Sequence, residues 1–297
     1  PMRIMKNLKG EPYGGAWPIE DSNVLDCINN FLHGKKYIEL NTINTQTYLE
    51  RFFEFICGSN NDLHGIGDYT SKAFSLGTTN AFDSFFIKHS KKRLVSFSGE
   101  YVYHGIVQRT IDGSTNTLTD SDQLKKGDAL VISVPFADTG DEHEQLEDVL
   151  IACDNLSIPV LIDMAYINIA QGLSIDLTHK CIDSITSSLS KVFFIPECRA
   201  GIRLQKKNLD DNLDMMSENN YVNRMAVNLS IDLFDNFDSN YITTKYKQQQ
   251  VNFCEQLELQ QSKTVIFGID RNKKFKQYNR GTNTNRLCFS KHFTNGV

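Results

Sequence analysis

The chain alternates between two kinds of hydrophobic periodicity, and this alternation indicates a mixed α/β fold. In residues 45–57, Leu49, Phe52 and Ile56 recur at the spacing of one helix face, which predicts an amphipathic helix. Elsewhere, short runs of apolar and β-branched residues bounded by turn residues predict strands. These strands are expected at 93–97, 129–134, 159–162 and 184–188.

A strand, a helix and a second strand follow one another in the middle of the chain. The strand at 129–134 is apolar enough to be buried on both faces, and residues 144–154 place Leu146, Val149 and Leu150 on one helix face. The next strand begins at residue 159. This order and spacing predict a βαβ unit with a parallel sheet.

The last third of the chain is more polar, with long stretches that contain few helix breakers. Helices are predicted at 225–234 and 246–259, and short strands at 264–267 and 286–290. The basic loop between these strands is interpreted as a solvated face. Its charges are Arg271, Lys273, Lys274, Lys276 and Arg280. The start of the chain, which holds the only tryptophan, is rich in glycine and proline and predicts an irregular arm. The predicted parts are an arm at 1–25, a large domain at 26–210 and a small domain at 211–297.

Composition and charge disfavour several classes of function. Hydrophobic residues make up 40% of the chain and charged residues 23%, which is ordinary for a globular protein. The net charge of −5 gives no support to a nucleic-acid partner, and no apolar run approaches the length of a membrane span. The seven cysteines are scattered, and neither cysteines nor histidines show metal-binding spacing. We therefore expect reduced thiols, a cytoplasmic location and no metal site.

Candidate chemistry gathers where the predicted strands end. Asp163 ends a buried strand, at the edge where open α/β sheets bind ligands, although it could equally be a helix N-cap. Tyr166 follows three residues later. Lys191 lies among serine hydroxyls, with Arg199 eight residues further on. This combination suits an amine that forms a Schiff base beside an anion, whereas most lysines are solvated surface charges.

A glycine turn at 77–81 opens another predicted helix. The backbone N–H groups of a helix start form a natural anion site, and the hydroxyls of Thr78 and Thr79 would add donors. Taken alone, the run from Gly77 to Thr79 is more simply explained as a plain N-cap.

Together these motifs resemble the cofactor site of the fold-type I pyridoxal phosphate enzymes, and most closely that of the class I/II aminotransferases, the aspartate aminotransferase superfamily. Residues 163–166 match the family's Asp-x-x-Tyr, and residues 188–191 match its Ser-x-Ser-Lys with a following arginine. The glycine turn at 77–81 also matches. The resemblance covers residues 70–205 well. It implies a three-layer α/β/α large domain with a mostly parallel sheet and a small, shortened α+β C-terminal domain.

The resemblance also assigns roles around the cofactor, pyridoxal 5′-phosphate. Lys191 would carry it as a Schiff base and move the substrate proton. Asp163 would pair with the pyridine nitrogen, and Tyr166 would hydrogen-bond the phenolic oxygen. The phosphate would be held by Gly77, Thr78, Thr79, Ser188 and Arg199. Tyr101 would stack on the ring, or it could be a packed core tyrosine instead.

Two positions bear on the substrate. The asparagine that the family places near the phenolic oxygen corresponds to Ala137, which costs one hydrogen bond, about 1 kcal/mol net. Arg286 lies in a segment that resembles the strand carrying the arginine for the substrate α-carboxylate, although it could be an ordinary surface arginine.

The sequence thus predicts a pyridoxal phosphate-dependent aminotransferase that acts on an amino acid and a keto acid by a ping-pong mechanism. The resemblance also implies a homodimer. Two alternatives stay open. One is another fold-type I reaction on the same cofactor, such as decarboxylation or a lyase reaction, because no motif here encodes which substrate bond breaks. The other is a non-catalytic binding protein with this fold.

Overall fold

The computed structural model describes residues 15–34 and 45–293 of the 297-residue chain. Most of the predicted arm therefore lies outside the described residues. In its described part, helix α2 (Ser22–His33) begins before residue 25, the predicted end of the arm. The side chain of Asp21 caps this helix by accepting a hydrogen bond from the N–H of Val24. The Trp17 ring is partly exposed beneath the ammonium of Lys291.

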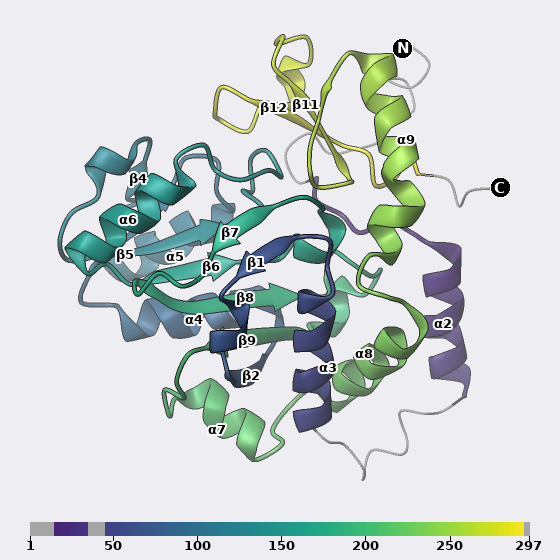
Figure 1. Cartoon of the computed structure of the whole chain (residues 1–297), viewed down its shortest axis with the longest axis horizontal. Helices are drawn as coiled ribbons and strands as arrows, with labels where there is room; N and C mark the ends of the chain where they lie inside the picture. Colours follow the sequence, from purple (N-terminus) through teal and green to yellow (C-terminus); the bar gives the residue numbers. More distant parts are fainter. Residues whose placement is uncertain (1–14, 35–44, 294–297) are drawn as a thin grey trace.

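A seven-stranded sheet forms the centre of the molecule (Figure 1), in the order β2-β9-β8-β6-β5-β3-β4. Strand β9 runs antiparallel to β2 and β8, and the other pairs are parallel, so the sheet is mostly parallel, as predicted. Its strands are β2 (Ser71–Ser75), β3 (Arg93–Phe97), β4 (Thr117–Leu118), β5 (Asp128–Ser133), β6 (Val160–Asp163), β8 (Ile182–Ser188) and β9 (Gly201–Gln205). A separate parallel pair joins β1 (Asp62–His64) to β7 (Ser174–Asp176).

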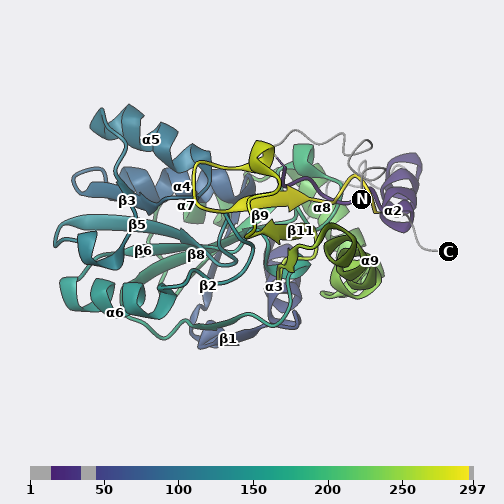
Figure 2. The same ribbon diagram turned by 90° about the horizontal axis from the view of Figure 1, so that it is seen from above.

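Helices cover both faces of this sheet, which gives the three-layer arrangement seen from above in Figure 2. Helices α4 (Gly77–Lys88) and α5 (Val102–Asp112) lie on one face, and α6 (Leu146–Leu156) lies on the other. The predicted βαβ unit is confirmed as β5-α6-β6, with the two strands paired in parallel. The predicted helix at 45–57 is confirmed as α3 (Thr45–Cys57).

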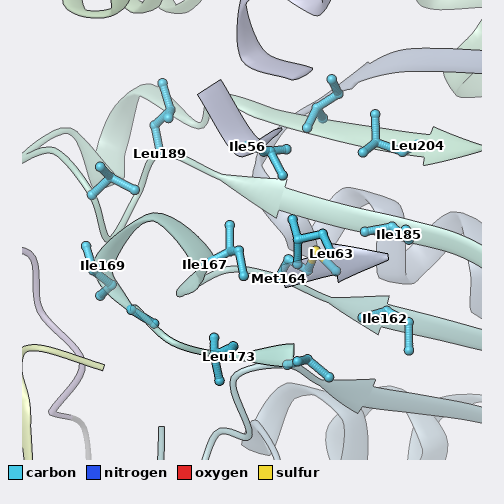
Figure 3. Close-up of a cluster of buried hydrophobic side chains, with 14 of the residues drawn as sticks. Ile56, Leu63, Ile162, Met164, Ile167, Ile169, Leu173, Ile185, Leu189 and Leu204 are labelled. Carbon is cyan, nitrogen blue, oxygen red and sulfur yellow. The ribbon is translucent and has the colours of Figure 1, made fainter. Parts of the chain in front are cut away.

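The hydrophobic core follows from the alternation of side chains along the strands. On β5, Ala129 and Val131 pack with residues of α4 and α5, whereas Leu130 and Ile132 belong to the cluster on the opposite face. Figure 3 shows part of that larger cluster, in which residues of β6, β8 and β9 meet a residue of α3. The labelled members from these elements are Ile162, Ile185, Leu204 and Ile56.

The C-terminal part contains α7 (Asn212–Glu218), α8 (Arg224–Asn236), α9 (Tyr241–Leu257) and a small antiparallel sheet. The sheet is made of β10 (Gln260–Gln261), β11 (Phe267–Asp270) and β12 (Asn285–Cys288). Helix α8 packs beside α2 and α3, so helices from the N-terminal and C-terminal parts of the chain lie together. Within the described ranges, no helix is both long enough and apolar enough to cross a membrane.

The strand predicted at 264–267 was wrong in position, because β11 begins only at Phe267. The preceding residues bond to loops of the large sheet instead of extending the small sheet. Thr264 donates both its N–H and its hydroxyl to the carbonyl of Gly140, and Val265 donates to that of Ile169. These bonds use the backbone that the prediction assigned to a strand.

Candidate active site

A cavity of about 630 Å³ opens at the carboxyl ends of the sheet strands. Strand ends supply its floor, because Ser133, Asp163 and Ser188 are the last residues of β5, β6 and β8. Nine of the ten site residues predicted from the sequence line this cavity, and the tenth, Gly77, lies against the guanidinium of Arg199. The nine are Thr78, Thr79, Tyr101, Asp163, Tyr166, Ser188, Lys191, Arg199 and Arg286.

Lys191 follows the carboxyl end of β8 and is mostly buried. Its Nζ donates a hydrogen bond of 2.5 Å to the carbonyl oxygen of Ala16, so the arm reaches the cavity. Burial lowers the pKa of the Lys191 ammonium, and Arg286 and Arg199 lower it further, while Cys288 and Asp163 act in the opposite direction. A lowered pKa makes the neutral, nucleophilic amine easier to form.

Asp163 is buried at the end of β6, where its Oδ1 accepts a 3.0 Å hydrogen bond from the N–H of Ala165. Burial raises the pKa of Asp163 to about 8, and the nearby Glu100 raises it further, whereas Lys191 lowers it. Asp163 is not a helix N-cap, because Tyr166 occupies the N-cap position of the short helix η5 (Ile167–Ile169) that follows.

Arg199 and the start of α4 together form a region rich in hydrogen-bond donors. The Arg199 Nη2 donates to the hydroxyl of Thr79 at 2.9 Å and to the carbonyl of Leu76 at 3.1 Å. Gly77 has φ +71°, a conformation that L side chains rarely adopt, and a Cβ there would stand 2.4 Å from Arg199 Nη2, so this position favours glycine. Helix α4 has no side-chain cap, which removes the simpler N-cap interpretation of Thr78 and Thr79.

Tyr101 and Arg286 also depart from the simpler alternatives that the sequence allowed. Tyr101 is 44% exposed and lines the cavity, so it is no packed core tyrosine. Arg286 is only 4% exposed, with its Cζ 4.1 Å from the centre of the Phe267 ring, so it is no surface arginine. The Phe267 and Tyr166 rings in turn lie nearly perpendicular to each other, at a centroid distance of 5.6 Å.

Sequence reasoning missed a second buried carboxyl group in the cavity, that of Glu100. The backbone N–H of Ser133 donates to it at 2.7 Å, and the Ser133 hydroxyl donates as well. Ser133 and Asp163 are paired residues of neighbouring parallel strands, so their side chains share one face of the sheet. Burial raises the pKa of Glu100 to about 7. The only signal in the sequence was its place directly after the turn that follows a strand.

The structure also corrects the interpretation of the basic loop. Arg280 is no part of a solvated face, because its side chain lines the cavity and is 13% exposed. Its Nη1 donates to the carbonyl of Ala137 at 2.5 Å, and Asp138 lies 3.7 Å away. Nothing in the local pattern separates Arg280 from the exposed Lys273, Lys274 and Lys276, because only the fold of the loop turns it inward.

The residues of the cavity fit pyridoxal phosphate, the cofactor that the resemblance implies. The cavity has donors at one helix start, a carboxyl group on a strand end and a buried amine. In addition, the Ser190 hydroxyl is buried beside the cavity and has no hydrogen-bond partner among the described residues. An unsatisfied buried hydroxyl and a cluster of donors favour a polar, anionic occupant.

The fold brings together one further polar group that the sequence did not predict. Ligand-type atoms of Asp154, His179 and Cys181 all lie within 4.8 Å of one another. Their contacts are internal, because Asp154 binds the ring nitrogen of His179 at 2.7 Å and accepts the backbone N–H of Cys181. We interpret this group as a structural link between α6 and the segment before β8.

Comparisons with known proteins agree on one family. The family model "Aminotransferase class I and II" matches residues 103–265, more than half of the chain. No curated protein sequence gives a significant match. Among solved structures, aspartate aminotransferase from Thermus thermophilus with maleate has a TM-score of 0.66 at 11% identity, over 97% of this chain and 90% of that chain.

A lyase and a second aminotransferase also share the fold. The pyridoxal phosphate-bound C–S lyase from Staphylococcus hominis has a TM-score of 0.66 at 12% identity, over 92% of this chain and 86% of that chain. Histidinol-phosphate aminotransferase from Clostridium acetobutylicum has a TM-score of 0.61 at 15% identity, over 87% of this chain and 82% of that chain. The fold, the cavity and the family match together show that the chain belongs to the class I and II aminotransferases, whose cofactor is pyridoxal 5′-phosphate.

Proposed function

We propose that this protein is an aminotransferase that moves an amino group between an amino acid and a keto acid. The observation that carries the proposal is the convergence of Lys191, Asp163 and Arg199 on one cavity, although they lie on different segments. Each of the three has a feature suited to its role. Lys191 has a lowered pKa, Asp163 is the last residue of a strand, and Arg199 donates a hydrogen bond to Thr79 in the first turn of α4.

Lys191 is the proposed attachment point and the group that moves a proton at the substrate α-carbon. When bound, the cofactor supplies a ring that withdraws electrons from that carbon. Asp163 would pair with the ring nitrogen and keep it protonated, and the Tyr166 hydroxyl would hydrogen-bond the ring oxygen. Arg199, Ser188 and the N–H groups of Thr78 and Thr79 would hold the phosphate. Arg286 would bind the substrate α-carboxylate.

The direct test is the absorption spectrum of the purified protein with added pyridoxal phosphate, before and after borohydride. We expect a visible band that reduction traps as a covalent modification of Lys191, located by peptide mass spectrometry. A wild-type protein without such a band would refute the assignment of Lys191.

A second candidate is a lyase, since a C–S lyase is as similar in structure as the aminotransferases. The two reactions differ in their need for a second substrate. An aminotransferase forms a keto acid continuously only when an acceptor keto acid is present. Steady release of a keto acid and ammonia without any acceptor would favour the lyase.

We also propose a cytoplasmic homodimer. Val102 and Tyr101 are exposed apolar side chains at the cavity, with exposed Leu76 and Ile106 on the adjoining elements. A second copy covering this mouth would bury them and close the site. The seven cysteines, all among the described residues, form no disulfide with one another, which fits a reducing compartment. Light scattering tests the homodimer: a monomeric mass with full activity would refute it.

A further inference from the structure

Two arginine side chains converge on one carbonyl oxygen at the edge of the cavity. Arg280, in the loop before β12, and Arg286, on β12 itself, both donate an Nη1 hydrogen bond to the oxygen of Ala137. Two donors that share an acceptor lie within about 6 Å of each other, the sum of two ordinary hydrogen-bond lengths. The two guanidinium groups therefore stand side by side, and both line the cavity.

The two arginines have more donors than the protein satisfies. Each guanidinium carries five N–H donors in a planar fork. Arg286 lies over the Phe267 ring, and its Nε is buried without a hydrogen-bond partner among the described residues. Of the two arginines, Arg280 has an ion pair among the described residues, with Asp138 at a long 3.7 Å, and Arg286 has none there. Unused donors on a buried arginine favour an additional acceptor.

The loop that carries Arg280 is fixed in place. The amide of Asn279 donates to the carbonyl oxygens of Thr282 and Thr284 and to the side chain of Asn285. The Thr282 hydroxyl donates to Asp138 at 2.8 Å. Arg280 is therefore held toward the cavity before any ligand arrives, which lowers the entropic cost of binding one.

Two neighbouring guanidinium groups favour a negatively charged acceptor between them. The carboxyl groups near Arg280 are Asp138, 3.7 Å away, and the buried Glu100. Burial lowers the pKa of Arg280 to about 10, and Arg286 lowers it further, which shows that the two cations repel each other. A carboxylate between the two guanidinium groups would offset this repulsion.

We propose that Arg280 and Arg286 form a two-arginine clamp that holds one carboxylate of the substrate. The clamp deepens the proposed function and rests on it, because it assigns Arg280 to substrate binding in the same site. The carbonyl oxygen of Ala137 accepts a hydrogen bond from each guanidinium group. Its methyl side chain carries no hydrogen-bond donor, so the donors at this place come from the arginines. A substrate with a single carboxylate satisfies the clamp, so a second acidic group is not required.

The test compares Arg280→Gln and Arg286→Gln with the control Arg271→Gln, which changes a half-exposed arginine of the same region outside the cavity. The probes are propionate, with one carboxylate, and maleate, with two. Their binding is measured by calorimetry on protein with and without pyridoxal phosphate. We expect either cavity substitution to weaken both probes about ten- to a hundredfold, the value of one charged hydrogen bond, and the control to change neither.

Two results would overturn the clamp. Unchanged propionate binding in Arg280→Gln would remove Arg280 from the carboxylate site. Weaker maleate binding with unchanged propionate binding would assign Arg280 to a second acidic group instead. Arg280→Lys, which keeps the charge without the fork, covers the case of misfolding and should bind propionate more weakly than wild type. Absence of cofactor uptake by wild type would refute the proposed function alone, since the titration without pyridoxal phosphate still tests the clamp.

Discussion

The cavity has two sides that are built in different ways. The sheet side, made of Asp163, Ser188, Lys191 and Arg199, comes from strand ends and the segment directly after β8. The hairpin side consists of Arg280 and Arg286, which come from the small C-terminal sheet and its loop and reach the cavity by bonding to Ala137. On the sheet side, spacing within short motifs determines which side chains meet. On the hairpin side, only long-range contacts do so.

This difference bears on function. The sheet side presents an amine, a carboxyl group and phosphate-type donors, which together suit the cofactor. The hairpin side presents two cations with unused hydrogen-bond donors, which suits the reversible binding of a substrate carboxylate. If the comparison is correct, sheet-side changes should affect cofactor binding and chemistry, whereas hairpin-side changes should affect substrate affinity.

The largest effect is expected from Lys191→Ala. Removing the amine removes both the covalent attachment of the cofactor and the proton transfer, so activity should fall about 10⁴-fold or more. The matched control is Lys180→Ala, at an exposed position. Borohydride trapping followed by peptide mass spectrometry checks the attachment. A reducible adduct that persisted in the Lys191 variant would show that another amine carries the cofactor.

Asp163→Asn should separate chemistry from binding. The substitution keeps the shape of the side chain but removes the charge that would hold the ring nitrogen protonated, so kcat should fall about a hundredfold or more. Cofactor affinity, measured by fluorescence titration, should fall much less. Equal losses in both quantities would mean that Asp163 has only a structural role.

Arg199→Gln should act in the opposite way. It removes a charged donor beside Thr79 and the start of α4, so the dissociation constant of pyridoxal phosphate should rise about ten- to a hundredfold. At saturating cofactor, the KM for the amino acid should stay near the wild-type value. A raised KM with unchanged cofactor affinity would place Arg199 on the substrate side and break the comparison.

The smallest effect concerns the pH dependence of stability in the cofactor-free protein. Glu100 and Asp163 have folded-state pKa values raised by burial to about 7 and about 8, above the values of 4.5 and 3.8 of the free groups. The folded state therefore binds more protons between these limits. Its stability is greatest below pH 4 with respect to these groups and is lost as the pH rises through 7 and 8.

Glu100→Gln should flatten this decline by a few degrees in melting temperature, because it removes one titrating group and the repulsion on Asp163. Two cations face the pair: Lys191 lowers the pKa of Asp163, and Arg280 lowers that of Glu100. Thermal melts from pH 5 to 9 measure the effect, with Glu255→Gln at an exposed position as the control. An equally steep decline in the Glu100 variant would contradict the coupling of the two carboxyl groups.

The sequence by itself determined the parallel sheet, the βαβ unit and the placing of Asp163 and Lys191 at strand ends. These features depend on local periodicity and on the rule that parallel strands end at one edge, so a few neighbouring residues carry the information. The strand predicted at 264–267 was wrong because its backbone bonds to a distant loop at Gly140 and Ile169, which no local pattern records.

The tertiary structure alone decided the remainder of the site. Glu100 is a cavity carboxyl group because its turn brings it to Ser133, beside Asp163 on the next strand. Arg280 lies among residues whose charges look alike in the sequence, and it is turned inward only because Ala137 and Asp138, more than a hundred residues away, accept from it and pair with it. Burial and charge pairing depend on which segments meet in space, and local sequence does not encode those meetings.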